Sequence, residues 1–554
     1  MFKKYTFLLV GLMALVQPIR AETADEPTEG IRQQLIDTRL SCLAPAIPLD
    51  AASLDALRAF YQQRDFQPAW DDEHLEALTE QLARLADDGL DPERYFVTAL
   101  RQLRAIETHS PRFIACRDAL ATQAYWQALH HLRFGQLDPA TVEPIWHAEG
   151  TAPVVDQTAL LADAEAGLDD LPAAFERARP DFKPYRELRR LYAARRGQPL
   201  PVWLPIPSGP LLKPGAVDAR VPMLEQRLVS EGYLPRLLLN TEAGEHREGE
   251  HLYSEERVMA VKTFQRYHLL KEDGIVGPQT MAALNRSPAE RMEQIRVNLE
   301  RLRWLYREIS PTGVVVDIAG AEVVFYRDGE PVWRARTQVG RPTRATPVLR
   351  SVITHLTLNP TWTVPPTILR VDKLPEIRRN PDYLAENRMR VFDREGNELD
   401  PRSVDWYNPG AIRLRQDAGS HNALGQVAIR FPNPFSVYLH DTPSQRLFDN
   451  LPRTFSSGCV RVENVSQLID QLLADASPQD RERIQRQWES GRTLRADLPH
   501  PVPVLLAYWT VQVGEHGELL FRPDMYGHDA RILAALNAPR PGIASAAPAP
   551  AGES

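Results

Sequence analysis

The chain has 554 residues, of which 43% are hydrophobic and 25% charged, and its formal net charge is −8. That length is too great for a single hydrophobic core, so we expect about three or four domains. The acidic balance argues against nucleic acid as a partner, because phosphate binding requires a basic surface.

The first 21 residues have the pattern of a secretory signal peptide. Lys3 and Lys4 precede an apolar run from Phe7 to Val16, and a short polar stretch follows up to Ala21. The apolar run is half of the ~20 residues that a membrane-spanning helix needs, so a cleaved signal is favoured over a membrane anchor. We therefore expect an exported, soluble mature protein with no transmembrane span.

The chain contains three cysteines, Cys42, Cys116 and Cys459. Exported proteins tend to pair their thiols, and Cys42 and Cys116 both lie in the N-terminal part. Sequence alone leaves this bridge open, because it does not place two cysteines close together. If they pair, Cys459 is left over, and a leftover thiol is either buried and inert or reactive.

Residues 30–200 form a predicted helical domain, because apolar residues recur there at spacings of three and four. The adjacent His130 and His131 have no further ligands at a metal-binding spacing, so we interpret them as structural. Residues 200–215 are rich in proline and glycine, which predicts a linker or extended connection.

Residues 216–286 predict a small unit of three short helices around one core. The run "AVKTFQRYHLLKEDGIVGPQTMAALN" resembles the second half of the small peptidoglycan-binding domain of wall-active enzymes. A polar insertion interrupts the match at residues 240–251. The resemblance implies that this unit binds the cell wall, with an ordinary three-helix bundle as the alternative.

A helix is predicted directly after this unit. Ser287 and Glu290 form a capping box, and Pro288 occupies the first helical position.

From residue 313 the apolar pattern changes to a period of two, which predicts a mostly-β domain over about residues 310–515. The alternation lapses between about residues 365 and 416. We interpret this lapse as an inserted subdomain or lid over the site, with a helical excursion that has no gating role as the alternative. The Ala/Pro-rich tail, residues 538–554, is predicted to be disordered. The fold class is therefore α+β and multidomain.

Candidate catalytic residues lie in the second half of the β-rich region. In "SVYLHDTP", strand alternation places Tyr438 and His440 on one face and Val437 and Leu439 toward the core. Cys459 follows 19 positions after His440, which is enough chain to leave the strand and return beside it.

The residues around Cys459 favour a reactive thiol. Gly458 removes a side chain where a substrate backbone approaches, and it lets successive N–H groups converge as an oxyanion hole. Arg461 is near enough in sequence to favour a thiolate. A Cys/His pair predicts acyl transfer through a thioester, in which His440 accepts the thiol proton and delivers it to the leaving amine. A buried core cysteine with an unrelated histidine is the alternative.

The stretch "HDTPSQRLFDNLPRTFSSGCVRVEN" resembles the active-site signature of L,D-transpeptidases with a YkuD-type catalytic domain. "NALG", which begins at Asn422, and "FPNPFSVYLHDTP" strengthen the match. The helical N-terminal region, the wall-binding unit and the insertion make the arrangement most similar to the large YcbB-like branch. Many family members have histidine directly before the Gly-Cys pair, where this chain has Ser457. Proton transfer is therefore expected to rest on His440.

The resemblance implies a periplasmic enzyme that needs no metal or organic cofactor and acts on peptidoglycan stem peptides. Cys459 would attack the bond between diaminopimelate and a terminal D-alanine, and the amine of a second stem would resolve the thioester as a 3→3 cross-link. Carbapenems typically acylate family members, and other cell-wall synthesis enzymes are conceivable partners. Ser457, Gly458 and Arg461 are expected to support the site. Tyr438, Asn422 and Trp362 are expected to place substrate, with a core position equally open for Trp362.

Three alternatives remain open. Water as acceptor would give an L,D-carboxypeptidase or hydrolase, and a lysine of a wall lipoprotein would give an attachment enzyme. A non-catalytic wall-binding scaffold is the third. A zinc enzyme built on His440 and Cys459 is disfavoured because no third ligand stands at a recognisable spacing.

Overall fold

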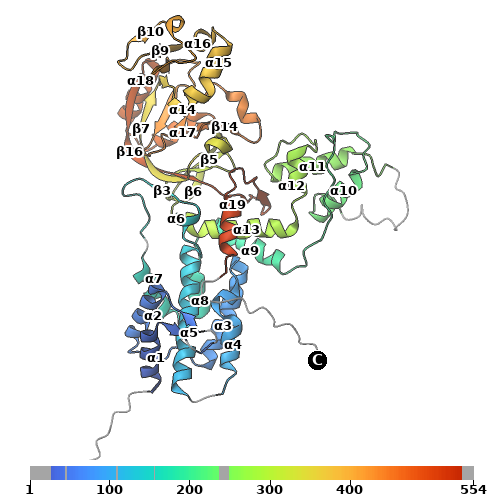
Figure 1. The fold of residues 1–554 in the computed structure, drawn as a ribbon, viewed down its shortest axis with the longest axis vertical. Helices are drawn as coiled ribbons and strands as arrows, with labels where there is room; N and C mark the ends of the chain where they lie inside the picture. The colour runs from blue at the N-terminus through green and yellow to red at the C-terminus, as the bar shows by residue number, and fades with distance from the viewer. Residues whose placement is uncertain are drawn as a thin grey trace, which may run out of the picture.

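The computed structural model describes residues 26–539, except 41, 44–45, 108–109, 155 and 236–248. The signal peptide expected at residues 1–21 lies outside the described residues, as does nearly all of the tail expected to be disordered. Figure 1 shows a helical column in the lower half, a β-rich body above it and a small helical module at the side. None of the described helices combines the length and apolar character needed to cross a membrane.

The helical column packs around α5 (Pro111–Phe134), whose many alanines let neighbouring helices approach closely on several sides. A disulfide between Cys42 and Cys116 ties the N-terminal segment to this helix, which resolves a pairing that the sequence left open. The other helices are α1 (Glu26–Asp37), α2 (Ala51–Gln63), α3 (Asp72–Arg84), α4 (Val97–Arg104), α6 (Pro139–Val142), α7 (Gln157–Ala166), α8 (Leu171–Ala178) and α9 (Lys183–Arg196). A short strand pair, β1 (Arg39–Leu40) with β2 (Ile47–Pro48), lies near the disulfide.

The side module consists of α10 (Val221–Ser230), α11 (Glu255–Tyr267) and α12 (Pro278–Leu284), packed around one apolar core. Leu228, Val261 and Phe264 are fully buried at its centre. The predicted arrangement of three short helices is confirmed.

The long helix α13 (Pro288–Leu305) connects the module to the β-rich body. Its start forms the predicted capping box: the Glu290 N–H donates to the Ser287 hydroxyl, and the Glu290 carboxylate accepts from the Ser287 N–H. The reciprocal bonds satisfy two backbone donors that would otherwise lack partners.

The β-rich body is a closed sheet in the order β12-β13-β15-β6-β5-β4-β16-β7, because β12 also pairs with β7. Valine, leucine and isoleucine side chains fill its interior. Its strands are β4 (Gly313–Asp317), β5 (Glu322–Arg327), β6 (Glu330–Gly340), β7 (Leu349–Leu358), β12 (Val427–Arg430), β13 (Leu439–His440), β15 (Val460–Val462) and β16 (Leu494–Ala507). The helices α17 (Val465–Leu472) and α18 (Pro478–Glu489) follow β15, and β14 (Thr454–Ser456) pairs with β6.

The helical column contributes a strand to this sheet. β3 (Trp146–His147) pairs in parallel with β7, in the register Trp146 to Leu349. Backbone hydrogen bonds thus join two parts of the chain that lie about 200 positions apart in sequence.

The predicted interruption after residue 365 has a small sheet of its own, in the order β10-β9-β11-β8. Its separate core includes Val391 and Leu414, both fully buried. The strands span only two to four residues each, so alternation is too brief to show in the sequence. The elements are β8 (Trp362–Thr363), α14 (Pro366–Ile368), the π-helix Leu369–Lys373, α15 (Leu374–Arg379), α16 (Tyr383–Glu386), β9 (Met389–Phe392), β10 (Glu398–Leu399) and β11 (Arg413–Gln416). We call this part the insert, residues 362–416.

Regular structure continues past residue 515, where the β-rich domain was expected to end. The hairpin β17 (Val511–Val513) and β18 (Leu519–Phe521) is followed by α19 (His528–Leu536), which packs against α13.

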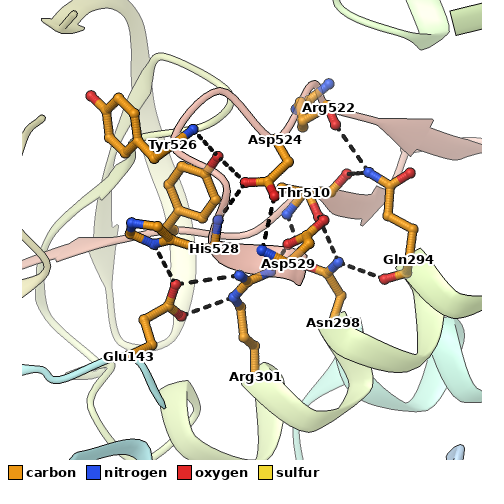
Figure 2. Close-up of polar contacts among 11 residues, drawn as sticks. Glu143, Gln294, Asn298, Arg301, Thr510, Arg522, Asp524, Tyr526, His528 and Asp529 are labelled. Carbon is orange, nitrogen blue, oxygen red and sulfur yellow. Dashed lines mark hydrogen bonds and ion pairs between the residues drawn. The ribbon is translucent and has the colours of Figure 1, made fainter. Parts of the chain in front are cut away.

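A buried polar network holds these parts together, and Figure 2 shows it around Arg301 of α13. The Arg301 guanidinium is fully buried and pairs with Glu143, at 2.9 Å, and with Asp529, at 2.6 Å. Asp529 also accepts a hydrogen bond from Thr510, whose N–H donates to Asn298. The network therefore joins the end of the column, α13, the loop before β17 and α19.

Removal of the guanidinium should destabilise this joint strongly. Arg301→Met leaves two carboxylates buried without their partner, and we expect a loss of about 3–5 kcal/mol in the free energy of unfolding. Urea unfolding followed by circular dichroism measures it. Arg486→Met removes an ion pair with Glu482 in which both side chains are exposed, and it serves as the matched control with little expected change. Equal unfolding midpoints for the two variants would contradict this role of Arg301.

Candidate active site

The Cys459 thiol and the His440 imidazole are carried by two adjacent strand segments. β13 and β15 run parallel, with Leu439 opposite Val460 and His440 opposite Arg461. In this register Cys459 lies beside Tyr438. Strand alternation turns these two side chains, together with those of His440 and Arg461, to one face of the sheet. Leu439 and Val460 point to the other face and are fully buried in the core. The predicted orientation of Tyr438 and His440 is confirmed.

His440 is almost completely buried, and its ring orientation is fixed by a backbone contact. Its Nδ1 lies 2.5 Å from the Asp441 carbonyl oxygen, so Nδ1 carries the proton. The other ring nitrogen, Nε2, is then left with a lone pair. Burial, assisted by the positive charge of Arg461, lowers the pKa of His440 to about 3. The imidazole is therefore neutral at physiological pH and able to accept a proton.

Burial raises the pKa of the Cys459 thiol above that of an ordinary cysteine. Hydrogen bonding from Tyr438 and the charges of Arg430 and Arg461 act in the opposite direction but do not outweigh burial. The expected effect of Arg461 thus has the right sign and is too small to produce a resting thiolate. At rest the thiol and the imidazole are therefore both neutral, and the thiol donates to the Ser436 carbonyl at 3.7 Å.

The basic residues around the thiol are held in place by specific partners. Arg461 donates to Gln338 at 3.0 Å, and the Arg430 guanidinium lies over the Tyr438 ring at 3.7 Å. These contacts direct positive charge toward the sulfur without a carboxylate beside it.

The loop before Cys459 is fixed by hydroxyl groups. Gly458 has a φ of 115°, a conformation that side chains rarely tolerate. Its N–H donates to Ser456 Oγ at 3.1 Å, and Thr346 Oγ1 donates to the Gly458 carbonyl at 2.9 Å. The Gly458 N–H is therefore engaged within the loop, and the convergence of successive N–H groups as an oxyanion hole stays a prediction.

Ser457 is bonded to a residue that the sequence gave no reason to select. Arg344 donates from Nη1 to Ser457 Oγ at 2.9 Å and forms a two-pronged ion pair with Asp372 of the insert, at 2.5 and 3.1 Å. One guanidinium thus links the insert to the residue two positions before Cys459. Arg344 lies 113 positions from Ser457, so only the tertiary fold brings them together.

These side chains line a cleft of about 810 Å³ between the closed sheet and the insert. Cys459, His440, Ser457, Arg461, Tyr438 and Trp362 all line it. Trp362 also packs on the core of the insert, which confirms the core position, and its contact with substrate stays a prediction. Among the described residues, no group of three or more His, Cys, Asp or Glu side chains is placed to hold a metal ion.

Asn422 does not contact the cleft, so the prediction that it binds substrate is not supported. Its side chain is 1% exposed, it donates to the Asp417 and Gln416 carbonyls, and it accepts from the Leu424 N–H. These bonds use both ends of the amide to hold the loop after β11.

Comparison with known families assigns three parts of the chain. Residues 311–488 match the model of the L,D-transpeptidase catalytic domain, which has the YkuD fold. The chain contains an L,D-transpeptidase catalytic domain. Residues 218–284 match the "Putative peptidoglycan binding domain", and residues 55–191 match the "Scaffold domain". The side module and the helical column are therefore these two domains.

Individual relatives cover parts of the chain. A Haemophilus influenzae protein named "Putative L,D-transpeptidase" is 36% identical over 249 residues, which are 44% of this chain and 50% of the relative. The match thus spans about half of that relative's length. The solved L,D-transpeptidase structures from Xylanimonas cellulosilytica and Mycobacterium smegmatis are 18% and 14% identical, and both have a TM-score of 0.18. They cover 54% and 35% of this chain, and 99% and 57% of their own chains.

The pKa of the Cys459 thiol can be tested by alkylation. Because burial raises this pKa, the rate at which iodoacetamide alkylates Cys459 should rise with pH. The midpoint of that rise should lie above about 8.5, the pKa of a free cysteine. Arg461→Gln removes a charge that lowers the pKa, so the midpoint should move to still higher pH. Mass spectrometry of the alkylated protein measures both profiles. A midpoint below that of a free cysteine would contradict a neutral resting pair.

The link between Arg344 and Asp372 should hold the insert against the cleft that contains Cys459. Arg344→Gln breaks both prongs of the ion pair, and we expect faster hydrogen exchange over residues 366–379 and acylation of Cys459 that is about 10- to 100-fold slower. Arg390→Gln is the matched control, because Arg390 forms exposed ion pairs with Glu398 and Asp417 on the same insert. Acylation at the normal rate in Arg344→Gln would exclude a positioning role.

Proposed function

We propose that this protein is a periplasmic L,D-transpeptidase that joins peptidoglycan stem peptides by 3→3 cross-links through a Cys459 thioester. One observation carries the proposal: Cys459 and His440 share one face of the parallel pair β13 and β15, at the cleft of an L,D-transpeptidase catalytic domain. The peptidoglycan-binding domain supports the same substrate.

In the first half-reaction His440 acts as a general base. Its Nε2 accepts the thiol proton as the sulfur attacks the carbonyl between diaminopimelate and the terminal D-alanine. Arg430 and Arg461 stabilise the negative charge that passes from the sulfur to the carbonyl oxygen. The imidazolium then donates its proton to the departing amine of D-alanine, which leaves the stem as a thioester on Cys459.

The low pKa of His440 suits the second of these two proton transfers, the donation to the leaving amine. A buried imidazolium next to Arg461 is unfavourable, so the proton acquired from the thiol is readily passed to the leaving amine. The neutral resting thiol also remains uncharged until a carbonyl group is in place, which limits reaction with other electrophiles.

In the second half-reaction an acceptor amine enters the cleft and attacks the thioester. His440 accepts a proton from this amine, and the sulfur leaves and is reprotonated. A cleft of about 810 Å³ between the sheet and the insert has room for a second stem peptide as the acceptor.

Product analysis with purified protein tests the proposal. Incubation with disaccharide tetrapeptides should release D-alanine and yield dimers with a tripeptide donor stem, detected by mass spectrometry. Cys459→Ala should lower turnover by about 10³-fold or more, because it removes the nucleophile, while binding to isolated cell walls persists.

Other products would identify the alternatives. Tripeptides without dimers would contradict transpeptidation and indicate an L,D-carboxypeptidase. Equal turnover by the wild type and Cys459→Ala would contradict the thioester mechanism.

A further inference from the structure

A second cavity, of about 530 Å³, lies at the joint between the peptidoglycan-binding domain and the rest of the chain. It shares no lining residue with the catalytic cleft. The walls come from the ends of α9, α10 and α11, the linker after α9, the start of α13 and the β17–β18 hairpin. We call this space the joint cavity. In Figure 1 the domain projects to the side of α9 and α13, where these elements meet.

Four side chains that line the joint cavity have no polar partner within the described chain. The Glu231 carboxylate, the Arg195 guanidinium and the hydroxyls of Tyr233 and Tyr267 form no hydrogen bond or ion pair there. Buried and half-buried polar groups are usually satisfied within a folded protein. Glu231, Tyr233 and Tyr267 are half-buried and Arg195 is exposed, so these groups remain free to bind a ligand. Polar groups that converge on one cavity are the pattern of a ligand site.

Glu231 is the most informative of these groups. It lies at the end of α10, half-buried, and burial raises its pKa to about 7 although Arg291, Arg227 and Arg195 act to lower it. None of these guanidiniums contacts the carboxylate directly. A cation placed against Glu231 would supply the missing partner.

The cavity lining also offers positive charge. Arg291 is held by its hydrogen bonds to the Ala283 carbonyl and Gln294, and it stacks on Phe521 at 4.6 Å. Those two bonds leave other N–H groups of its guanidinium without a partner. Arg195 is exposed at the mouth of the cavity.

The charges that line the cavity are balanced, with Glu231 and Glu518 against Arg195 and Arg291. Such a set suits a ligand that carries both charges, and it suits a neutral sugar or a simple anion less well. We propose that the joint cavity binds the zwitterionic end of an amino acid, with its ammonium on Glu231 and its carboxylate on Arg195 and Arg291. The rings of Tyr233 and Tyr267 would flank the aliphatic part.

This inference deepens the proposed function and rests on it for the source of the ligand. The free amino-acid end of a diaminopimelate side chain in a stem peptide has this chemistry. Because the walls belong to the peptidoglycan-binding domain and to α9 and α13 alike, an occupied cavity would tie that domain to the scaffold while the catalytic cleft handles another stem.

Calorimetric titration of the full-length Cys459→Ala protein with meso-diaminopimelate tests the site, because this protein cannot turn over a substrate. We expect diaminopimelate to bind at least tenfold more tightly than either of two comparison compounds. These are cadaverine, which has only ammonium groups, and pimelate, which has only carboxylates. Glu231→Gln and Arg195→Gln should each weaken diaminopimelate binding at least tenfold. The matched control Glu256→Gln makes the same change at an exposed position of α11, outside the cavity, and should bind normally.

Several results would overturn the site. These are no binding of diaminopimelate, equal binding of pimelate or cadaverine, stronger binding of N-acetylglucosamine, or full affinity in both Glu231→Gln and Arg195→Gln. Arg195 is exposed, so its substitution gives a folded protein even if Glu231→Gln is unstable, and thermal unfolding checks both. Product analysis of the wild type remains a separate readout, so a failed binding test leaves the proposed transpeptidation intact.

Discussion

The parallel pairing of β13 with β15 is the constraint on which the catalytic site depends. Parallel strands require a long connection between them, and here residues 441–459 leave the sheet and return to it. The register then fixes which side chains become neighbours: a slip of one residue would turn Cys459 into the core and Val460 into the cleft. The pairing of β15 with β6 on its other side holds that register.

The same constraint explains the electrostatics of the site. The two groups are placed where burial disfavours both a thiolate and an imidazolium. Cys459 and His440 are therefore both neutral, although two arginines lie close to them. In the proposed mechanism the thiol therefore loses its proton during the attack and not through a resting ion pair. Its reactivity would then depend on the presence of a bound carbonyl group.

Features set by neighbouring residues could be predicted from the sequence, and features set by distant ones could not. Alternation assigned Tyr438 and His440 to the cleft face, and the spacing of Ser287 and Glu290 gave the capping box, because both depend on a few consecutive residues. The bond from Arg344 to Ser457 joins segments more than 100 positions apart, and no local pattern marks it. Asn422 stands in a motif typical of the family, yet its amide serves the loop, since a motif does not tell structural from substrate contacts.

The buried network at Arg301 and the joint cavity show how the domains can cooperate although each has its own core. Arg301 links the scaffold domain, α13 and α19 through fully buried charges, and such links are rigid because any separation would expose unpaired ions. The peptidoglycan-binding domain meets this rigid frame partly through a cavity lined with charged and aromatic side chains. A ligand that binds only when the domain and the frame are together stabilises that arrangement by its binding free energy. Under the proposed occupancy of the joint cavity, the position of this domain relative to the cleft would therefore respond to the wall itself.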